Sequence, residues 1–289
     1  MAGILDLRLA PDRFLDLQTD RAKAERLAAL DDLSFAELVE AYWRMTPEVP
    51  APLGERYTQA IVRGPERAEA WLSGPLEPSP GDAVLDVGCG TGGLVVAAAR
   101  RGAVVTGIDI ALRWLVIARR QCEEAGTSAR LLAADGAGMP FRPCAFDRVF
   151  SVNVVEHAAD QRGLLHWCLQ AARPDGGCLV VVLNRFGLAP DPVTGLVGVS
   201  WLPRPLAAPY VRWRRNTRYF VRPLSVGHLR SLVGATGGVS VGPAPLPASV
   251  APTARGEERL RTAYERLRGR PATRAVLTWV APHLQVVTE

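Results

Sequence analysis

The sequence predicts an α/β fold in which helices cover a doubly wound, mostly parallel sheet. From Asp82 onward, short apolar runs alternate with amphipathic segments of helix length. This alternation is typical of parallel strands joined by helical crossovers. The chain of 289 residues is long enough to bury a substantial core, and its apolar (48%) and charged (22%) fractions are those of an ordinary globular protein. The expected strands are 84–87, 104–108, 131–134, 146–152 and 178–183, and the expected helices are 94–101, 112–124 and 162–172.

The region before this pattern is predicted to be helical. Ser34 and Glu37 have the spacing of a capping box ahead of apolar residues, and a second amphipathic stretch runs from about Leu53 to Leu72. Prolines and glycines at 73–81 then interrupt regular structure. We therefore expect a helical cap at residues 1–75 and a main domain at 76–289.

The regular alternation ends after Leu183. Residues 184–224 form a proline-rich insertion, which we expect to act as a lid over the site. Between 201 and 222 arginines alternate with aromatic residues, and no Asp or Glu occurs from 192 to 256. Such a surface suits an anionic ligand with an apolar or sugar part, or peripheral contact with an anionic membrane. A solvated arginine-rich face is the alternative. A helix at 225–233, a strand at 239–241, a charged helix at 256–268 and a final strand at 282–288 are expected to follow.

The first predicted strand runs directly into a glycine-rich turn that opens a helix. The turn reads Asp86-Val87-Gly88-Cys89-Gly90-Thr91-Gly92. Because glycine has no Cβ, a ligand can approach the bare backbone at such a turn. The same glycines also satisfy the dinucleotide-binding pattern, so a nicotinamide-dependent dehydrogenase is an alternative at this point.

Carboxylates accompany the first three predicted strands. Asp86 precedes the first glycine by two residues, Asp109 ends the second strand just before Ile110, and Asp135 follows the third strand, next to Gly136. The carboxyl ends of parallel strands bind ligands near a topological switch point, so we expect these acids at one site. Asp109 is suited to accept both hydroxyls of a ribose, and its alternative role is to cap the following helix.

Taken together, these segments resemble the class I methyltransferases, the seven-stranded, Rossmann-like family that depends on S-adenosylmethionine. The specific part of the resemblance covers residues 82–183. It implies S-adenosylmethionine as cofactor, bound by the glycine turn, with Asp86 near the methionyl amino group, Asp109 at the ribose, and Asp135 and Gly136 at the adenine, which Met139 would cover. It also implies that the last strand is antiparallel. The cofactor-binding residues expected on this basis are Asp86, Gly88, Cys89, Gly90, Thr91, Gly92, Asp109, Ile110, Asp135, Gly136 and Asn153.

The segment Ser151–Asp160 follows the fourth strand, where this family places residues beside the transferred methyl group. His157 is the candidate general base, a role that contributes about 10²–10⁴-fold to a rate; its alternative role is that of a helix-start histidine bonded to nearby backbone. The pair Glu156-His157 resembles quinone-biosynthesis O-methyltransferases, some of which hold a metal ion through Glu-x-x-Glu-His. Here Asn153 replaces the first acid, so we expect no metal site.

The resemblance implies O-methylation of a small molecule or glycan in bacterial specialised-metabolite or envelope-glycan biosynthesis. The alternatives are C-methylation of a prenyl diphosphate or polyketide-type substrate, and a cofactor-binding scaffold without activity. The Asn/Asp-Pro-Pro-Tyr/Phe motif of DNA amino-methyltransferases does not occur in the sequence, so no nucleic-acid partner is expected. With no signal-peptide pattern, no apolar run of about 18–20 residues and five cysteines without paired spacing, the expected location is the cytoplasm.

Overall fold

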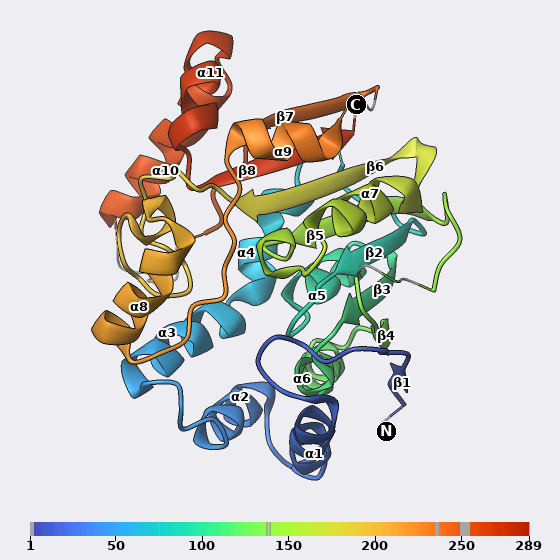
Figure 1. The fold of residues 1–289 in the computed structure, drawn as a ribbon. Coiled ribbons are helices and arrows are strands. Elements are labelled where there is room, and N and C mark those ends of the chain that lie inside the picture. The colour runs from blue at the N-terminus through green and yellow to red at the C-terminus, as the bar shows by residue number, and fades with distance from the viewer. Residues whose placement is uncertain are drawn as a thin grey trace.

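A computed structural model describes residues 3–74, 76–136, 138, 140–234, 237–248 and 255–288. One eight-stranded sheet runs through the protein, with the strand order β1-β4-β3-β2-β5-β6-β8-β7 (Figure 1). The strands are β1 (Leu5–Asp6), β2 (Ala83–Val87), β3 (Val104–Asp109), β4 (Arg130–Ala133), β5 (Phe146–Val152), β6 (Ala172–Leu183), β7 (Val239–Pro243) and β8 (His283–Thr288). The first six in spatial order are parallel, and β8 is antiparallel to both β6 and β7. The predicted α/β class and the antiparallel final strand are confirmed.

Helices pack on both faces of this sheet. They are α1 (Leu17–Ala28), α2 (Phe35–Arg44), α3 (Ala51–Val62), α4 (Gly64–Leu72), α5 (Gly93–Arg100), α6 (Leu112–Glu124), α7 (Gln161–Ala171), α8 (Arg204–Arg215), α9 (Val226–Val233), α10 (Arg255–Arg268) and α11 (Pro271–Val280), with short 3-10 turns η1 (Val155–His157) and η2 (Val199–Trp201). None of the helices in the described residues has the length and apolar character needed to cross a membrane.

Two expectations about these elements are corrected by the structure. The sheet has an additional edge strand, β1, which pairs with β4 and makes eight strands instead of seven. The amphipathic stretch from Leu53 to Leu72 is two helices, because α3 ends at Val62 and α4 begins at Gly64. Pro65 follows at once, and a proline is tolerated in the first turn of a helix but not in its interior. The capping box at Ser34 and Glu37 is present as predicted.

Successive residues of the central strand point into two different cores. On β2, Val84 belongs to the core that contains α5 and α6, whereas Leu85 and Val87 belong to the core that contains α7 and α9. This alternation is the period of two that a strand buried on both faces must have. The chain order reverses beside β2, whose neighbours are β3 and β5, and the carboxyl ends of these strands are therefore the expected place for a ligand.

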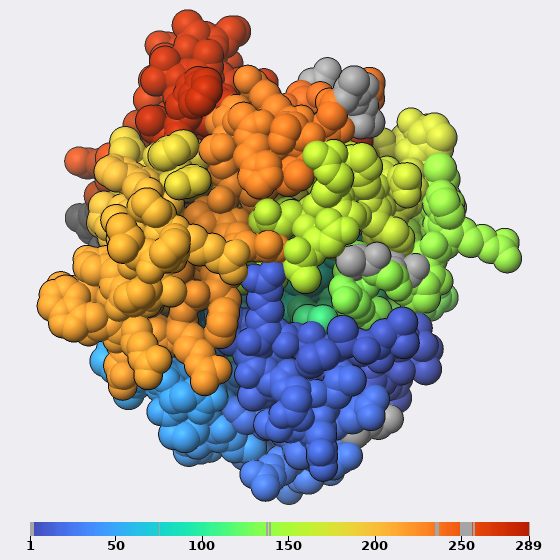
Figure 2. All heavy atoms as spheres, in the orientation of Figure 1, coloured from blue at the N-terminus to red at the C-terminus, as the bar shows by residue number. Residues whose placement is uncertain are grey.

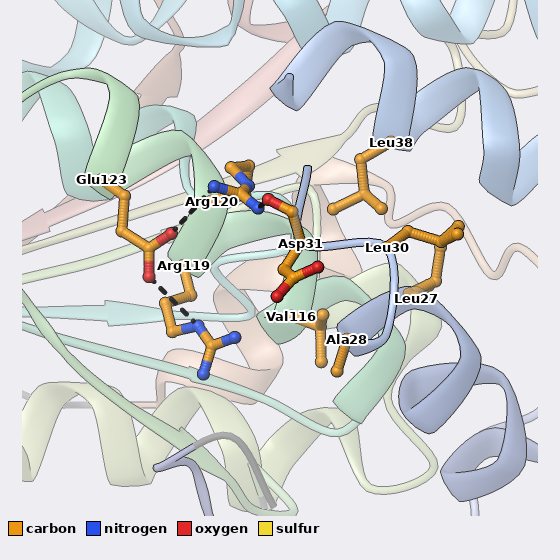
Figure 3. A pocket seen from close by; sticks show the side chains of 9 residues that line it. All are labelled: Leu27, Ala28, Leu30, Asp31, Leu38, Val116, Arg119, Arg120 and Glu123. Carbon is orange, nitrogen blue, oxygen red and sulfur yellow. Dashed lines mark hydrogen bonds and ion pairs between the residues drawn. The ribbon is translucent and has the colours of Figure 1, made fainter. Parts of the chain in front are cut away.

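The N-terminal helices extend the core on the α6 side. The capping box places Phe35 and Leu38 of α2 in the same hydrophobic core as Leu115 of α6. A cavity of about 20 Å³ lies between α1, α2 and α6 and is lined by Leu27, Ala28, Leu30, Asp31, Leu38, Val116, Arg119, Arg120 and Glu123 (Figure 3). It has the volume of about one water molecule, so it is a packing defect and not a ligand site.

Residues 7–16, which we call the strap, cross the carboxyl-end edge of the sheet. The strap begins where the Leu7 N–H donates to the carbonyl of Ala133, at the end of β4. Further on, the Arg13 guanidinium donates to the carbonyls of Ala158 (2.9 Å) and Phe220 (3.2 Å). In Figure 2 this dark blue segment reaches the orange residues, and a hollow with teal atoms at its floor lies beside it.

The strap is held by a buried ionic cluster around Asp20. The Asp20 carboxylate, 2% exposed, accepts from the guanidinium groups of Arg8 and Arg113, each at 2.5 Å. It also accepts the Leu112 N–H at 3.0 Å and so caps the start of α6. Arg113 pairs in addition with Asp12 of the strap at 2.7 Å. One carboxylate therefore ties α1, the strap and α6 together.

Replacing Asp20 by asparagine is expected to lower the free energy of unfolding by about 3–5 kcal/mol, because two buried guanidinium groups lose their shared counter-charge. Equilibrium unfolding in urea measures the change. Glu258→Gln, which breaks an exposed pair with Arg261, is the control, with an expected loss below about 1 kcal/mol. Equal losses in both variants would contradict the role of the cluster.

Candidate active site

The glycine turn after β2 adopts a backbone that other residues rarely adopt. Gly88, Gly90 and Gly92 have φ values of +75°, +52° and +89°. A Cβ at Gly88 would lie 2.3 Å from Cγ2 of Val154, whereas a Cβ at Gly90 would meet no atom within 4 Å. The turn is therefore pressed against the segment after β5 at Gly88 and presents bare backbone to open space at Gly90.

Asp109 fixes this turn to the start of α6. Its Oδ2 accepts the Gly90 N–H at 2.8 Å, and its Oδ1 accepts the Ala111 N–H at 2.8 Å. Asp109 is not the N-cap of α6, which is Ala111, so the alternative role as an N-cap is not what the structure shows; the carboxylate instead holds the N–H of the N-cap residue. A carboxylate has about four lone-pair sites, so these two bonds leave capacity for a diol. Burial raises the pKa of Asp109, which shows that its charge lies in a poorly solvated place.

Asp86 lies directly beneath the turn. Its side chain is buried, with 3% of the residue exposed, and Oδ2 has no hydrogen-bond partner among the described residues. Burial, and secondly the charge of Asp109, raise the pKa of Asp86 to about 8. A buried carboxyl group without a partner is costly. A bound cation next to Asp86 would remove this cost.

The other residues expected at the cofactor surround these two acids. Asp135 and Gly136 are half-buried just after β4, and the Ala134 N–H donates to the carbonyl of Asp109, which brings the ends of β3 and β4 together. Met139 lies outside the described residues.

Cys89, Thr91 and Ile110 also belong to the expected set, but no side-chain hydrogen bond toward the turn is seen for them among the described residues. The Cys89 side chain is buried in the hydrophobic core and faces Gly107, so only its backbone belongs to the turn. Burial raises the pKa of its thiol well above the ordinary value. Thr91 and Ile110 are half-buried, and the Ile110 carbonyl accepts a hydrogen bond from Arg8.

The segment after β5 carries a strained residue. Asn153 has a φ of +58°, a left-handed conformation that costs a residue other than glycine about 1–3 kcal/mol. Its N–H donates to the carbonyl of Val181 at 2.8 Å, and its buried Oδ1 has no partner among the described residues. Strain and an unsatisfied amide oxygen at one position indicate a group positioned for a ligand.

His157 follows in η1, beside the same turn. Its N–H donates to the carbonyl of Val154, the residue that packs against Gly88. The buried Nδ1 has no partner within the part of the chain that the structure describes, so no bond of this atom to nearby backbone supports the structural alternative. Burial, and secondly the charge of Arg13, lower the pKa of His157 to about 4. The imidazole is therefore neutral near pH 7.

Glu156 is buried against the end of β6, and its Oε2 has no partner among the described residues. One of its oxygens, Oε1, accepts the Leu183 N–H at 3.2 Å, and burial raises its pKa to about 7. Within the described ranges, no three His, Cys, Asp or Glu side chains are grouped to hold a metal ion. The sequence did not predict that Arg13 bonds to Ala158 and Phe220 or that Val154 packs on Gly88, because these residues are distant from one another in the chain.

The chain is similar in sequence to known methyltransferases. The family described as "Methyltransferase domain" matches residues 84–176. The ubiquinone biosynthesis O-methyltransferase of Paracidovorax citrulli is 35% identical over 159 residues, which cover 52% of this chain and 60% of that protein. The protein of the same name from Methylocella silvestris is 30% identical over 175 residues, which cover 58% of this chain and 68% of that protein. The match thus spans only about 60% of the length of the first relative.

Among solved structures, an S-adenosylmethionine dependent methyltransferase from Mesorhizobium loti aligns over 76% of this chain and 96% of that one, with 19% identity and a TM-score of 0.49. The fold, the glycine turn and the sequence relatives define a class, the S-adenosylmethionine-dependent methyltransferases. This chain belongs to the class I branch of that family.

S-adenosylmethionine, the methyl donor of the family, fits the residues present. The unpartnered carboxyl oxygen of Asp86 would receive its cationic methionyl part, and the open backbone at Gly90 leaves room above the turn. Asp109 would accept the ribose hydroxyls, and Asp135 with Gly136 would face the adenine. These assignments of single residues are predictions.

Asp109→Ala is expected to weaken cofactor binding by about 1.5–3 kcal/mol, the range for hydrogen bonds to a charged group. Isothermal titration calorimetry with S-adenosylhomocysteine measures the change. Asp147→Ala, at the opposite end of the sheet, where it accepts the Ala83 N–H, is the control for a lost carboxylate. An affinity equal to that of the wild type would show that Asp109 only orders the turn.

Asp86→Asn is expected to stabilise the cofactor-free protein at high pH. The folded pKa of about 8 lies above the unfolded value near 4. This carboxyl therefore lowers the free energy of unfolding as the pH rises from about 4 to beyond 8. The variant should match the wild type below about pH 4, where Asp86 is protonated in both states, and melt at least about 2–4 °C higher at pH 9. A melting difference that does not change with pH would be inconsistent with a protonated Asp86.

Proposed function

We propose that this protein transfers a methyl group from S-adenosylmethionine to a hydroxyl oxygen of a small-molecule acceptor. The observation that carries this proposal is His157, a half-buried and neutral imidazole whose Nδ1 is buried without a partner among the described residues, and whose N–H bonds to Val154, the residue packed on Gly88. A neutral ring nitrogen is able to accept the proton that a hydroxyl loses on methylation. The matched relatives are named O-methyltransferases, which supports oxygen as the acceptor atom.

S-adenosylmethionine supplies an activated methyl group on a sulfonium. The hydroxyl oxygen bonds to the methyl carbon while the carbon–sulfur bond breaks, its electron pair stays on sulfur, and the hydroxyl proton moves to His157. Since the methyl group is already activated, the protein mainly aligns the two reactants, which is worth about 7–11 kcal/mol in well-oriented systems. In this proposal, Asn153 and the turn at Gly90 would hold the two reactants in line.

The strap would exclude water from the reaction. Arg13 ties it to the Ala158 carbonyl, one residue beyond His157, and Phe14 packs edge-on against Phe220 of the insertion with ring centroids 5.4 Å apart. The strap and the insertion therefore meet next to the candidate base. We propose that residues 184–224 form the lid of the acceptor site and that residues 1–75 form the cap, with the methyltransferase domain at 76–289.

The class of acceptor is inferred from the names of the matched relatives. The relatives act in ubiquinone biosynthesis according to their names, but the match leaves about 40% of the first relative uncovered. We propose a small-molecule or glycan acceptor of bacterial specialised-metabolite or envelope-glycan biosynthesis, and the cytoplasm as the place of action.

The direct test incubates the protein with S-adenosylmethionine carrying a trideuterated methyl group and a bacterial metabolite extract. Mass spectrometry then searches for products that gain the labelled methyl on oxygen. A labelled aryl or alkyl ether supports the proposal. Label found only on carbon would replace it by the C-methylation alternative, and cofactor binding without any labelled product would favour the inactive scaffold.

His157→Gln is expected to retain cofactor affinity while turnover falls by about 10²–10⁴-fold, since only the proton acceptor is lost. His166→Gln is the matched control, because the His166 ring already bonds to the Leu232 carbonyl at 2.9 Å, away from the turn. Unreduced turnover in His157→Gln would return His157 to a structural role.

The pH dependence follows from the lowered pKa of His157, which is about 4. A base must be unprotonated, so its contribution to kcat/KM is fully present above about pH 5 and lost as the pH falls through 4. We expect no inflection from His157 between pH 6 and pH 8 in a steady-state profile. An inflection near pH 6.5 that disappears in His157→Gln would contradict the buried, neutral imidazole.

A further inference from the structure

A second cavity lies outside the cofactor site, between the insertion and the beginnings of α7 and α9. It measures about 240 Å³ and is lined by Gln161, Arg185, Val199, Ser200, Leu202, Arg204, Ala207, Tyr219, Val221, Arg222, Pro223 and His228. We call it the arginine pocket. Three of its lining residues are arginines and none is acidic. Apolar side chains supply much of the remaining wall.

The arginines of the pocket have no carboxylate partner among the described residues. The guanidinium of Arg185 is half-buried and its recorded contact is the ring of Phe186, 5.6 Å away. Arg204 is exposed at the start of α8. Arg222 donates to the carbonyls of Ala158 and Ala159, and its buried Nε has no partner in the described part of the chain.

A fourth arginine adds to the positive charge. Arg13 of the strap bonds to the Ala158 carbonyl, which Arg222 also contacts. After burial, the charges of Arg222 and Arg204 are the causes that lower the pKa of Arg13. Like charges gathered in this way repel each other unless an anion lies among them. Backbone carbonyls hold Arg13 and Arg222, and the nearby carboxylate of Asp191 is bonded to Tyr219, so an anion with more than one negative charge would be favourable among these guanidinium groups.

We propose that the arginine pocket binds the phosphate or diphosphate group of a small molecule. Guanidinium groups recognise phosphate oxygens through paired hydrogen bonds, and three of them balance a dianion or trianion better than a single carboxylate. The apolar wall formed by Val199, Leu202 and Val221 suits an organic group esterified to that phosphate. The volume is sufficient for the anionic end of a ligand and a few adjoining carbon atoms.

The pocket lies next to the candidate base. Gln161, which lines it, donates to the carbonyl of Val155 at 3.1 Å, and the Arg222 N–H donates to the carbonyl of Glu156 at 2.9 Å. Both carbonyls belong to η1, the turn that carries His157. A phosphate bound here would therefore place the rest of its molecule near His157. The identification of that molecule with the methyl acceptor rests on the proposed function, whereas binding of the phosphate does not.

The test measures binding by isothermal titration calorimetry at constant ionic strength with three probes: inorganic phosphate, pyrophosphate and geranyl diphosphate. Wild-type protein is compared with Arg185→Gln and Arg204→Gln. Arg212→Gln, an exposed change on α8 outside the pocket lining, is the matched control for lost charge. We expect pyrophosphate affinity to fall about tenfold or more in each pocket variant and less than twofold in the control.

The outcomes separate the possible sources of the phosphate. Tighter binding of geranyl diphosphate than of pyrophosphate supports an esterified ligand, and equal binding supports a free anion in the same pocket. Equal affinity losses in Arg212→Gln and the pocket variants, or no binding of any probe, would overturn the proposal. S-adenosylhomocysteine binding is measured in parallel. If the wild-type protein does not bind S-adenosylhomocysteine, the proposed function is contradicted, while the proposal about the arginine pocket is unaffected.

Discussion

Two carboxyl groups at one glycine turn, the buried Asp86 and the half-buried Asp109, constrain the rest of this site. Asp109 holds the turn through the Gly90 N–H, and Asp86 lies below it without a partner for Oδ2. The charge of Asp109 and the surrounding burial keep Asp86 protonated near neutral pH, with a pKa of about 8. The cofactor-free protein therefore carries an electrostatic cost that a cationic ligand can remove. Because β2 pairs with β3, Asp86 and Asp109 lie close together, and their shared negative charge when ionised favours a ligand with a positive charge.

The same edge of the sheet is crossed by the N-terminal strap, which meets the insertion at residues 184–224. Asp20 joins α1 to α6 and, through Arg8 and Arg113, holds the strap across the ends of the strands. The insertion meets the strap where Phe14 packs against Phe220. A dry pocket strengthens every electrostatic interaction inside it. The lowered pKa of His157 is a consequence of this cover, because burial is its principal cause.

The central fold was predictable from the sequence because its signals are local. Apolar runs and glycines at fixed spacing placed β2 to β5 and α5 to α7 within one or two residues, and the capping box placed α2, whereas β6 begins at Ala172, six residues before its predicted start. The edge strand β1 was missed because two residues carry no periodic pattern and are held by pairing with Leu132 and Ala133. The helix α11 was not predicted either, because its apolar residues Val276 and Trp279 are exposed and so do not belong to a buried face. The arginine pocket could not be predicted from the sequence, because Arg185, Arg204 and Arg222 are far apart in the chain and come together only when the insertion folds.

A protonated Asp86 is expected to give up its proton when a cationic cofactor binds beside it. The most direct measurement is the heat of S-adenosylmethionine binding at pH 7 in buffers of different ionisation enthalpy, for wild-type protein and Asp86→Asn. With a pKa of about 8 in the free protein, the account predicts release of close to one proton per cofactor bound by the wild type and none by the variant. Binding heats that are independent of the buffer in wild-type protein would contradict it.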